Sequence, residues 1–471
     1  MSLVVGAAAA GRLDTEFSPA FEGFNAAVWA TGARSVREDG WIEARFGGRR
    51  GEHTYAHHPP LVQLQASAVA TTVGDHRWGY RGIALLSTLA AVWCCWGWLG
   101  ASGFSPGPRS LGLLVAAGTT LVVHYSVMLN MEMVWMPLAF ALLWAWTAAR
   151  GRDAPSGPLL WACGVLSALG CLAAHQGILL AFGLGLAGAA TARHTNRRTD
   201  PADRSVLLGA IVGTVGFLGW VVWVSGGLTD LFDAAATRSG QGVGWITFAN
   251  AQLGHTVSLF GLLGTAVLVV GTSMAILSDP RRRTVAIVLV GVALSYAVLF
   301  RQGATIHRYW NAALLPLVAL GAAVVGERIV LHLSRAIWVA LSLAAAQLLL
   351  FSVGSPARTL QSDVGLITHR AATSSGADLY STDLLGDWAT YEAGREVLPA
   401  YDCAAIEASA RDDAARDDAA LDDADTLVIT SARFASRAGM ESRWDDLTSA
   451  AEFSEQGAVA VAPRALSDTL C

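Results

Sequence analysis

Long apolar runs separated by short polar connections dominate the first 353 residues of the chain. Each run has the length and composition of a helix that crosses a bilayer, whose hydrocarbon core is about 30 Å thick. The runs lie at 82–100, 109–128, 133–149, 158–174, 176–192, 205–225, 256–277, 284–300, 309–326 and 336–353. The pattern predicts a mainly α-helical, polytopic membrane protein with a bundle of about ten spans over residues 82–353.

The segment before this bundle is only partly apolar. Residues 1–10 are apolar but too short to cross a bilayer, so we expect a truncated first helix or one that only dips into the membrane. Residues 59–74 begin with two prolines and predict an interfacial helix rather than a span, because they contain Gln63, Gln65, Thr71 and Thr72. Residues 1–81 are therefore expected to form an N-terminal segment with an outer loop and interfacial helices.

Arginine content alternates between successive connections. The rich set is "RGRD", "RHTNRRTDPADR", "SDPRRR" and "ERIVLHLSR", whereas the poorer set is "NMEM", "HQG", residues 226–255 and "RQGATIHRYW". Because cytoplasmic loops carry the excess of arginine, the rich set is expected in the cytoplasm. Residues 12–81 and the chain after about residue 355 then lie on the outer face of a multi-pass plasma-membrane protein.

The C-terminal part, residues 355–471, has a different pattern. Short strand-like pieces such as "ADLYST", "DTLVIT" and "GAVAVA" alternate with helical patterns, which predicts a small extracytoplasmic α/β domain. The acidic quasi-repeat "ARDDAARDDAALDDA" lacks the glycine turn of a calcium loop and favours a solvated helix or linker. Cys403 and Cys471 both fall in this exported domain, so a disulfide between them is expected.

Composition agrees with the pattern. Hydrophobic residues make up 53% of the chain and charged residues 15%, and the mean hydropathy is +0.44. These values exclude an ordinary soluble globular protein. The net charge of −5 and the absence of a basic patch give no indication of a nucleic-acid partner.

Ionisable and polar residues gather in the connections assigned to the outer face. Such groups are costly to leave unpaired at a membrane boundary, so a cluster of them is a candidate site. The candidates are Glu22, Asn25, Arg34, His57, His58, Asn130, Glu132, His175, Gln176, Arg301, His307, Arg308 and Tyr309.

Each candidate also has a purely structural interpretation. His57 and His58 fit a turn before the prolines, and Asn130 and Glu132 fit the cap of the helix near residue 133. His175 and Gln176 fit a sharp turn between spans, and Tyr309 fits an interfacial aromatic belt. Arg301 and Arg308 resist this interpretation, because they lie against the arginine bias.

The first outer loop resembles that of membrane glycosyltransferases with the GT-C fold. The resemblance rests on an acidic residue followed by "AR" and "GW", then "HHPPL", the "NME" turn and "HRYW" before "LP". It is similar to the group of protein O-mannosyltransferases and lipid A aminoarabinose transferases (glycosyltransferase family 39-like). The layout covers most of residues 12–350, whereas specific motif agreement is confined to about 20–81, "NME" and "HRYW".

The resemblance implies a polyprenyl-phosphate sugar donor, an acidic base in the first outer loop and, in many members, a soluble outer C-terminal domain. Many relatives have an Asp-Glu pair where this chain has "FEGFN", which leaves Glu22, Asn25 or Asp14 at the place of the base. Where relatives often have a lysine before the prolines, this chain has His58.

The chemistry agrees with this resemblance. A lipid-phosphate donor already contains a good leaving group, so the reaction needs a carboxylate to deprotonate the acceptor and cations to hold the phosphate. Glu22 fits the first role. His57, His58, Arg301, His307, Arg308 and Tyr309 fit donor and phosphate binding. Asn25, Arg34, Asn130, Glu132, His175 and Gln176 fit contact with the acceptor or support of the site.

Three alternatives stay open at this point. The histidines and the carboxylate leave room for a divalent metal, although no closely spaced ligand motif favours one. A transporter or lipid flippase is the alternative function, but it predicts polar residues near the midplane of the spans rather than at one face. The acceptor is an unknown extracytoplasmic protein, lipid or cell-envelope glycan.

Overall fold

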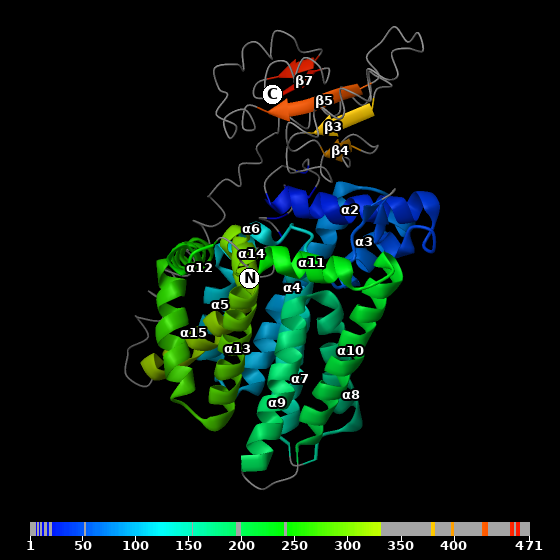
Figure 1. Ribbon diagram of the computed structural model, residues 1–471. Helices are drawn as coiled ribbons and strands as arrows, with labels where there is room; N and C mark the ends of the chain where they lie inside the picture. Colours follow the sequence, from blue (N-terminus) through cyan, green and yellow to red (C-terminus); the bar gives the residue numbers. More distant parts are fainter. Residues whose placement is uncertain are drawn as a thin grey trace, which may run out of the picture.

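The chain forms a bundle of helices capped at one end by helices that lie across it (Figure 1). The computed structural model describes residues 21–50, 53–152, 154–194, 199–239 and 243–330, a few residues before Phe21, and five strands after residue 377. The first helices are α2 (Phe21–Asp39), α3 (Leu61–Thr72), α4 (Arg77–Ala101), α5 (Pro106–Ala117), α6 (Thr120–Tyr125), α7 (Met131–Arg150), α8 (Gly157–Ala173) and α9 (His175–His194). The later ones are α10 (Pro201–Ser225), α11 (Thr229–Arg238), α12 (Trp245–Ile276), α13 (Pro280–Leu299), α14 (Arg301–Ile306) and α15 (Leu315–Val330).

Seven helices in the described part are long and apolar enough to cross a membrane. They are α4, α7, α9, α10, α12, α13 and the segment Arg308–Ile329, which joins the 3₁₀ helix η2 (Arg308–Leu314) to α15; α8 is a shorter apolar helix. Large apolar side chains such as Trp93, Trp161 and Leu208 are more than 60% exposed on these helices. Exposed apolar side chains on every side of a bundle are what a lipid environment requires.

Three predicted spans differ from the structure. The run 158–174 forms α8, which is shorter than the seven helices long enough to cross a membrane. The run 109–128 is divided into α5 and α6, because Gly118 ends the first helix and the Thr119 hydroxyl accepts a bond from the Val122 amide (3.3 Å) to start the second. The run 256–277 lies within the longer α12, which turns at Gly261 with φ 68° and ψ 174°. Only glycine adopts this conformation without steric cost.

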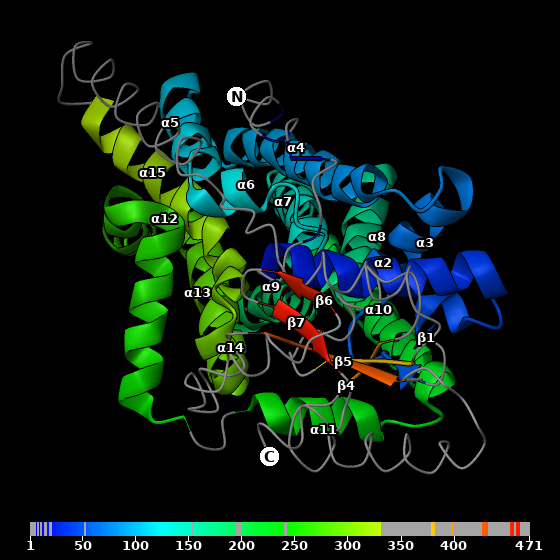
Figure 2. The ribbon, with the colours of Figure 1, turned by 90° about the horizontal axis from the view of Figure 1, so that it is seen from above.

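The capping end contains α2, α3, α11 and the part of α12 before Gly261. Seen from above, these segments lie across the ends of the bundle helices (Figure 2). The predicted helix over 59–74 is confirmed as α3, and it is too short to span a membrane. Pro60 stands at its N-cap, so the paired prolines start this helix.

Large buried side chains, three tryptophans among them, lie along the contact between α4 and α7. Trp98, Trp135 and Trp146 are at most 2% exposed, and Phe140 and Leu143 are buried with them. Helices α8 and α10 instead approach through glycines: a Cβ added to Gly209 would lie 2.1 Å from the Gly164 carbonyl oxygen. This close approach of two backbones is typical of helix packing in membranes.

Five strands after residue 377 form one sheet in the order β4-β3-β5-β7-β6. The strands are β3 (Asp378–Ser381), β4 (Val397–Pro399), β5 (Thr426–Ser431), β6 (Phe453–Glu455) and β7 (Ala458–Val461). β3 pairs in parallel with β4 and β5, whereas β7 pairs antiparallel with β5 and β6. The three predicted strand pieces are therefore strands.

Several predictions fall outside the described residues. These are the last span at 336–353, the helices of the C-terminal domain, the acidic quasi-repeat, and Cys403 and Cys471. The outer location of the C-terminal domain and the domain limits 1–81, 82–353 and 355–471 stay predictions.

Candidate functional site at the capped end

Three histidines from two distant segments meet at the capped end. The ring centroids of His57 and His58 are 4.3 Å apart, and the His58 centroid lies 5.8 Å from that of His175 at the start of α9. The Tyr55 ring packs against both His57 and His58, at 4.6 and 5.4 Å. Adjacent histidines cannot share a direction in an extended chain, so it is the bend before Pro59 and the Tyr55 ring that keep both near α9.

Arg238, the last residue of α11, completes this histidine group. Its Nη2 donates a hydrogen bond to Nε2 of His57 (3.0 Å). Because arginine only donates, this nitrogen of His57 accepts and carries no proton. The sequence contained the signal for Arg238, since it lies in the outer 226–255 segment and so violates the arginine bias in the same way as Arg301 and Arg308.

The histidines are held in the neutral form. Burial, followed by the positive charge of Arg238, lowers the pKa of His57 to about 3. Burial and the neighbouring His57 and Arg238 hold the pKa of His58 well below its usual value, and burial and Arg238 lower that of His307 to about 4. Near neutral pH the group therefore presents imidazole N–H donors and one arginine cation.

The turn between α13 and α15 brings in the second part of the site. The Tyr309 hydroxyl donates to Oδ1 of Asn25 on α2 (3.4 Å) and lies 3.1 Å from Nδ1 of His307. The turn is held from outside by α12, because Gln252 and His255 donate to the carbonyl oxygens of residues 304 and 305. The part of α12 before Gly261 therefore positions His307 and Tyr309.

Arg308 lies next to this turn and points toward α6. Its Nε donates to the Tyr125 hydroxyl, and the Tyr125 ring lies 6.1 Å from the Tyr309 ring. Tyr125 thus connects Arg308 to Tyr309 and fixes the direction of the guanidinium.

A buried polar group occupies the beginnings of α7 and α9. Asn130 donates to Oε2 of Glu132 (2.5 Å), and Glu132 is fully buried with Gln176 beside it. Oε1 of Glu132 and both amide atoms of Gln176 have no hydrogen-bond partner of ordinary geometry within the described ranges. Buried acceptors and donors of this kind need a partner, which makes the group a place for a ligand hydroxyl or water.

Two of the remaining candidates have partners outside this group. Arg34 forms an ion pair with Asp75 (2.7 Å), which the Tyr80 hydroxyl also contacts. The Arg301 guanidinium lies 4.4 Å from the centroid of the Trp245 ring. Position 22 belongs to α2, but the side chain of Glu22 and the whole of Asp14 lie outside the described residues.

The described part of the chain also bears on whether side chains could bind a metal ion. Within those residues, no group of three or more His, Cys, Asp or Glu side chains is arranged to hold a metal ion. Metal independence stays a prediction.

A known protein family matches part of the chain. The family model for dolichyl-phosphate-mannose-protein mannosyltransferases matches residues 57–223. No curated protein matches the chain.

Solved structures give the fold. ArnT from Cupriavidus metallidurans bound to undecaprenyl phosphate is similar with a TM-score of 0.64 and 15% identity, covering 98% of this chain and 97% of that one. Its apo state gives a TM-score of 0.65 with 14% identity and coverage of 100% and 98%. The archaeal oligosaccharyltransferase AglB from Archaeoglobus fulgidus gives 0.55 with 12% identity, covering 93% of this chain and 69% of that one. The structural likeness shows the GT-C fold in a chain with seven helices able to cross a membrane, and the family match over residues 57–223 indicates a glycosyltransferase.

Proposed function

We propose that the protein transfers a sugar from a polyprenyl-phosphate donor to an extracytoplasmic protein, lipid or cell-envelope glycan. The observation that carries the proposal is the convergence of Arg238 with His57, His58 and His175 at the capped end of the bundle. A phosphate at a membrane surface needs a cation and several N–H donors, and this group supplies both.

In the proposed reaction, the bond between the anomeric carbon and the donor phosphate oxygen breaks, and its electron pair goes to the phosphate. The acceptor oxygen bonds to the same carbon while a base takes the acceptor proton. Arg238, Arg308 and neutral imidazole N–H groups stabilise the charge that grows on the leaving phosphate. Arg301 and Tyr309 extend donor binding along the turn before α15.

Glu22 is the proposed base. It lies one turn before Asn25 in α2, and Asn25 contacts the Tyr309 hydroxyl from that helix. Positions three apart lie on the same side of a helix, which supports a location of residue 22 near the same site. Asp14 and Asn25 remain the alternatives for the place of the base.

The buried group of Asn130, Glu132 and Gln176 is proposed to bind or support the acceptor. His175, Asn25 and Arg34 are proposed for the same role.

No step of the proposed reaction requires a metal. We therefore expect transfer to continue when a chelator such as EDTA removes divalent ions, and loss of transfer that returns with added metal would contradict this expectation.

The direct test uses the purified full chain in detergent. It is incubated with polyprenyl-phosphate sugars of several kinds and candidate acceptors, and the release of polyprenyl phosphate is measured. Release that depends on one sugar donor supports the proposal. Absence of release with every donor, together with absence of donor binding, would overturn it.

A further inference from the structure

A polar cavity lies at the opposite end of the bundle from the histidine group. The histidine group includes His175 at the start of α9, whereas this cavity stands at the ends of α4 and α7 and at the start of α13. Its volume is about 190 Å³. The polar residues that line it are Trp98, Ser102, Thr147, Arg150, Asp279, Arg281 and Arg282.

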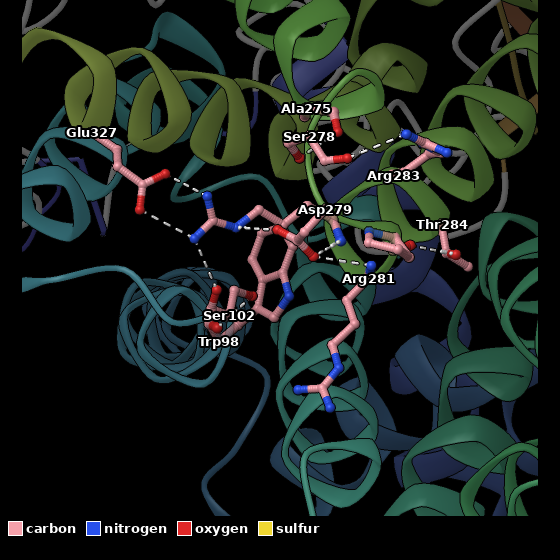
Figure 3. A network of polar contacts seen from close by, with 11 residues as sticks. Trp98, Ser102, Ala275, Ser278, Asp279, Arg281, Arg283, Thr284 and Glu327 are labelled. Carbon is pink, nitrogen blue, oxygen red and sulfur yellow. Dashed lines mark hydrogen bonds and ion pairs between the residues drawn. The ribbon is translucent and has the colours of Figure 1, made fainter.

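Two of the three arginines in the cavity wall are already neutralised. Arg282 pairs with Asp279 (3.1 Å) and with both carboxylate oxygens of Glu327, and Arg150 lies 3.8 Å from the buried Asp203. The two carboxylates nearest the cavity, Asp279 and Glu327, are therefore engaged by the same arginine (Figure 3).

Arg281 differs from its neighbours. Its side chain is directed away from Asp279 and Glu327 (Figure 3). Its backbone amide donates to Asp279 (3.0 Å), but within the described ranges its guanidinium has no hydrogen bond or ion pair. Arg281 therefore supplies positive charge to the cavity that no described carboxylate cancels.

Two buried donors face the same space. Trp98 is 0% exposed and Thr147 is 7% exposed, and both line the cavity. Neither the indole Nε1 of Trp98 nor the hydroxyl of Thr147 has a hydrogen-bond partner among the residues that the structure describes. Indole N–H only donates, so the missing partner is an acceptor. Unpaired buried donors beside an uncancelled guanidinium fit an anion with several acceptor oxygens.

We infer that this cavity binds a phosphate group, with Arg281, Trp98 and Thr147 as its ligands. The loops that frame it, "RGRD" and "SDPRRR", are the arginine-rich connections expected in the cytoplasm. Basic pockets between helices on that side of a membrane bind anionic lipid head groups. Inorganic phosphate presents the same oxygens, so the source of the phosphate group is decided by experiment. The inference does not depend on the glycosyltransferase reaction.

The test measures binding to the purified full chain by isothermal titration calorimetry. The probes are inorganic phosphate, dihexanoyl phosphatidylglycerol, and dihexanoyl glycerol, which lacks the phosphate. We expect Arg281→Gln to raise the dissociation constant of the phosphate-bearing probes by about tenfold or more, because it removes a charge-assisted contact. Thr147→Val keeps the side-chain volume and removes the hydroxyl, so it should raise the same dissociation constants severalfold.

Arg283→Gln is the matched control. Arg283 carries the same charge two residues away, but it donates to the carbonyl oxygens of Ile276 and Ser278 rather than facing the cavity. Binding of phosphatidylglycerol alone supports a lipid source, and binding of both phosphate-bearing probes supports the phosphate group itself. Absence of binding, binding that Arg281→Gln leaves unchanged, or equal loss in Arg281→Gln and Arg283→Gln would overturn the inference.

Discussion

Arg238 contributes to the low pKa of the histidines around it. Its charge helps to lower the pKa of His57, His58 and His307, after the larger effect of burial. The histidines therefore offer neutral N–H groups, and not the positive charge that we expected of the His57–His58 pair. A bound phosphate would be held by one strong cation and several neutral donors, which costs less to desolvate than a cluster of charges.

The role of Arg238 gives the first prediction. Arg238→Gln should raise the dissociation constant of a polyprenyl-phosphate donor by about tenfold or more, because a contact to phosphate is lost before and during the reaction. Equilibrium binding of the donor to the purified protein measures this change. Arg37→Gln removes an exposed arginine from the end of α2 at the same end of the molecule and should leave the constant unchanged. Equal effects of the two changes would mean that only overall charge matters.

The second prediction concerns the base. Glu22→Gln keeps size and hydrogen bonding but removes the proton acceptor, so turnover should fall by roughly 100-fold or more with donor binding nearly unchanged. Transfer assays on membranes measure the first effect and donor titration the second. If Glu22→Gln transfers normally while Asp14→Asn does not, the base is Asp14. If neither change matters, the proposed mechanism loses its base.

The third prediction is a pH dependence of stability. The unfolded chain protonates His57 below its ordinary pKa of 6.5, whereas the folded chain does so only near pH 3. The unfolded state thus binds more protons in this window, so the free energy of unfolding decreases as the pH is lowered, by at most about 1.4 kcal/mol per pH unit for each such histidine. The unfolding temperature should drop between pH 6.5 and pH 5. His57→Gln should reduce that drop, and an unchanged drop would contradict the assignment.

At the scale of elements, close contact between α8 and α10 depends on glycine. A Cβ at Gly209 would meet the Gly164 carbonyl oxygen, whereas a Cβ at Gly219, further along the same helix, would meet nothing within 4 Å. In Gly209→Ala the two helices must move apart, so the free energy of unfolding should decrease by roughly 1–3 kcal/mol. The unfolding temperature should fall accordingly. Gly219→Ala should be neutral or slightly stabilising. Thermal unfolding of both variants is the measurement, and equal midpoints would show that α8 and α10 do not need this contact.

Sequence patterns predicted the membrane-spanning helices better than the turns within and between them. Apolar runs gave the spans around α4, α7, α9, α10 and α13, because lipid requires long apolar helices whatever the tertiary structure. They missed the turn at Gly261, since glycines are frequent in membrane helices and this one carries no local signal. The position of α11, and with it Arg238, follows from how residues 226–255 fold back across the bundle end. Arginine bias could select Arg238 as unusual, but only tertiary packing places it beside His57.

At the scale of the whole molecule, the unequal arginine content of the two sets of loops gives the fifth prediction, which concerns topology. Reporter fusions in the 193–204 and 278–283 loops should report the cytoplasm, and a fusion at residue 375 should report the outer face. The structure agrees in one respect: the histidine group and the Arg281 cavity lie at opposite ends of the helices. A cytoplasmic signal at residue 375 would reverse the orientation and move the proposed transfer to the inner side.

The packed contact between α4 and α7 also has a consequence for the cell. Buried side chains such as Trp98, Phe140 and Leu143 fill this contact, and close packing leaves little space for a chain of water molecules between the two polar ends. Protons travel along such water chains, so a dry centre keeps the voltage across the membrane from leaking through the protein. The enzyme can then expose charged groups on both sides while the membrane around it remains an electrical insulator.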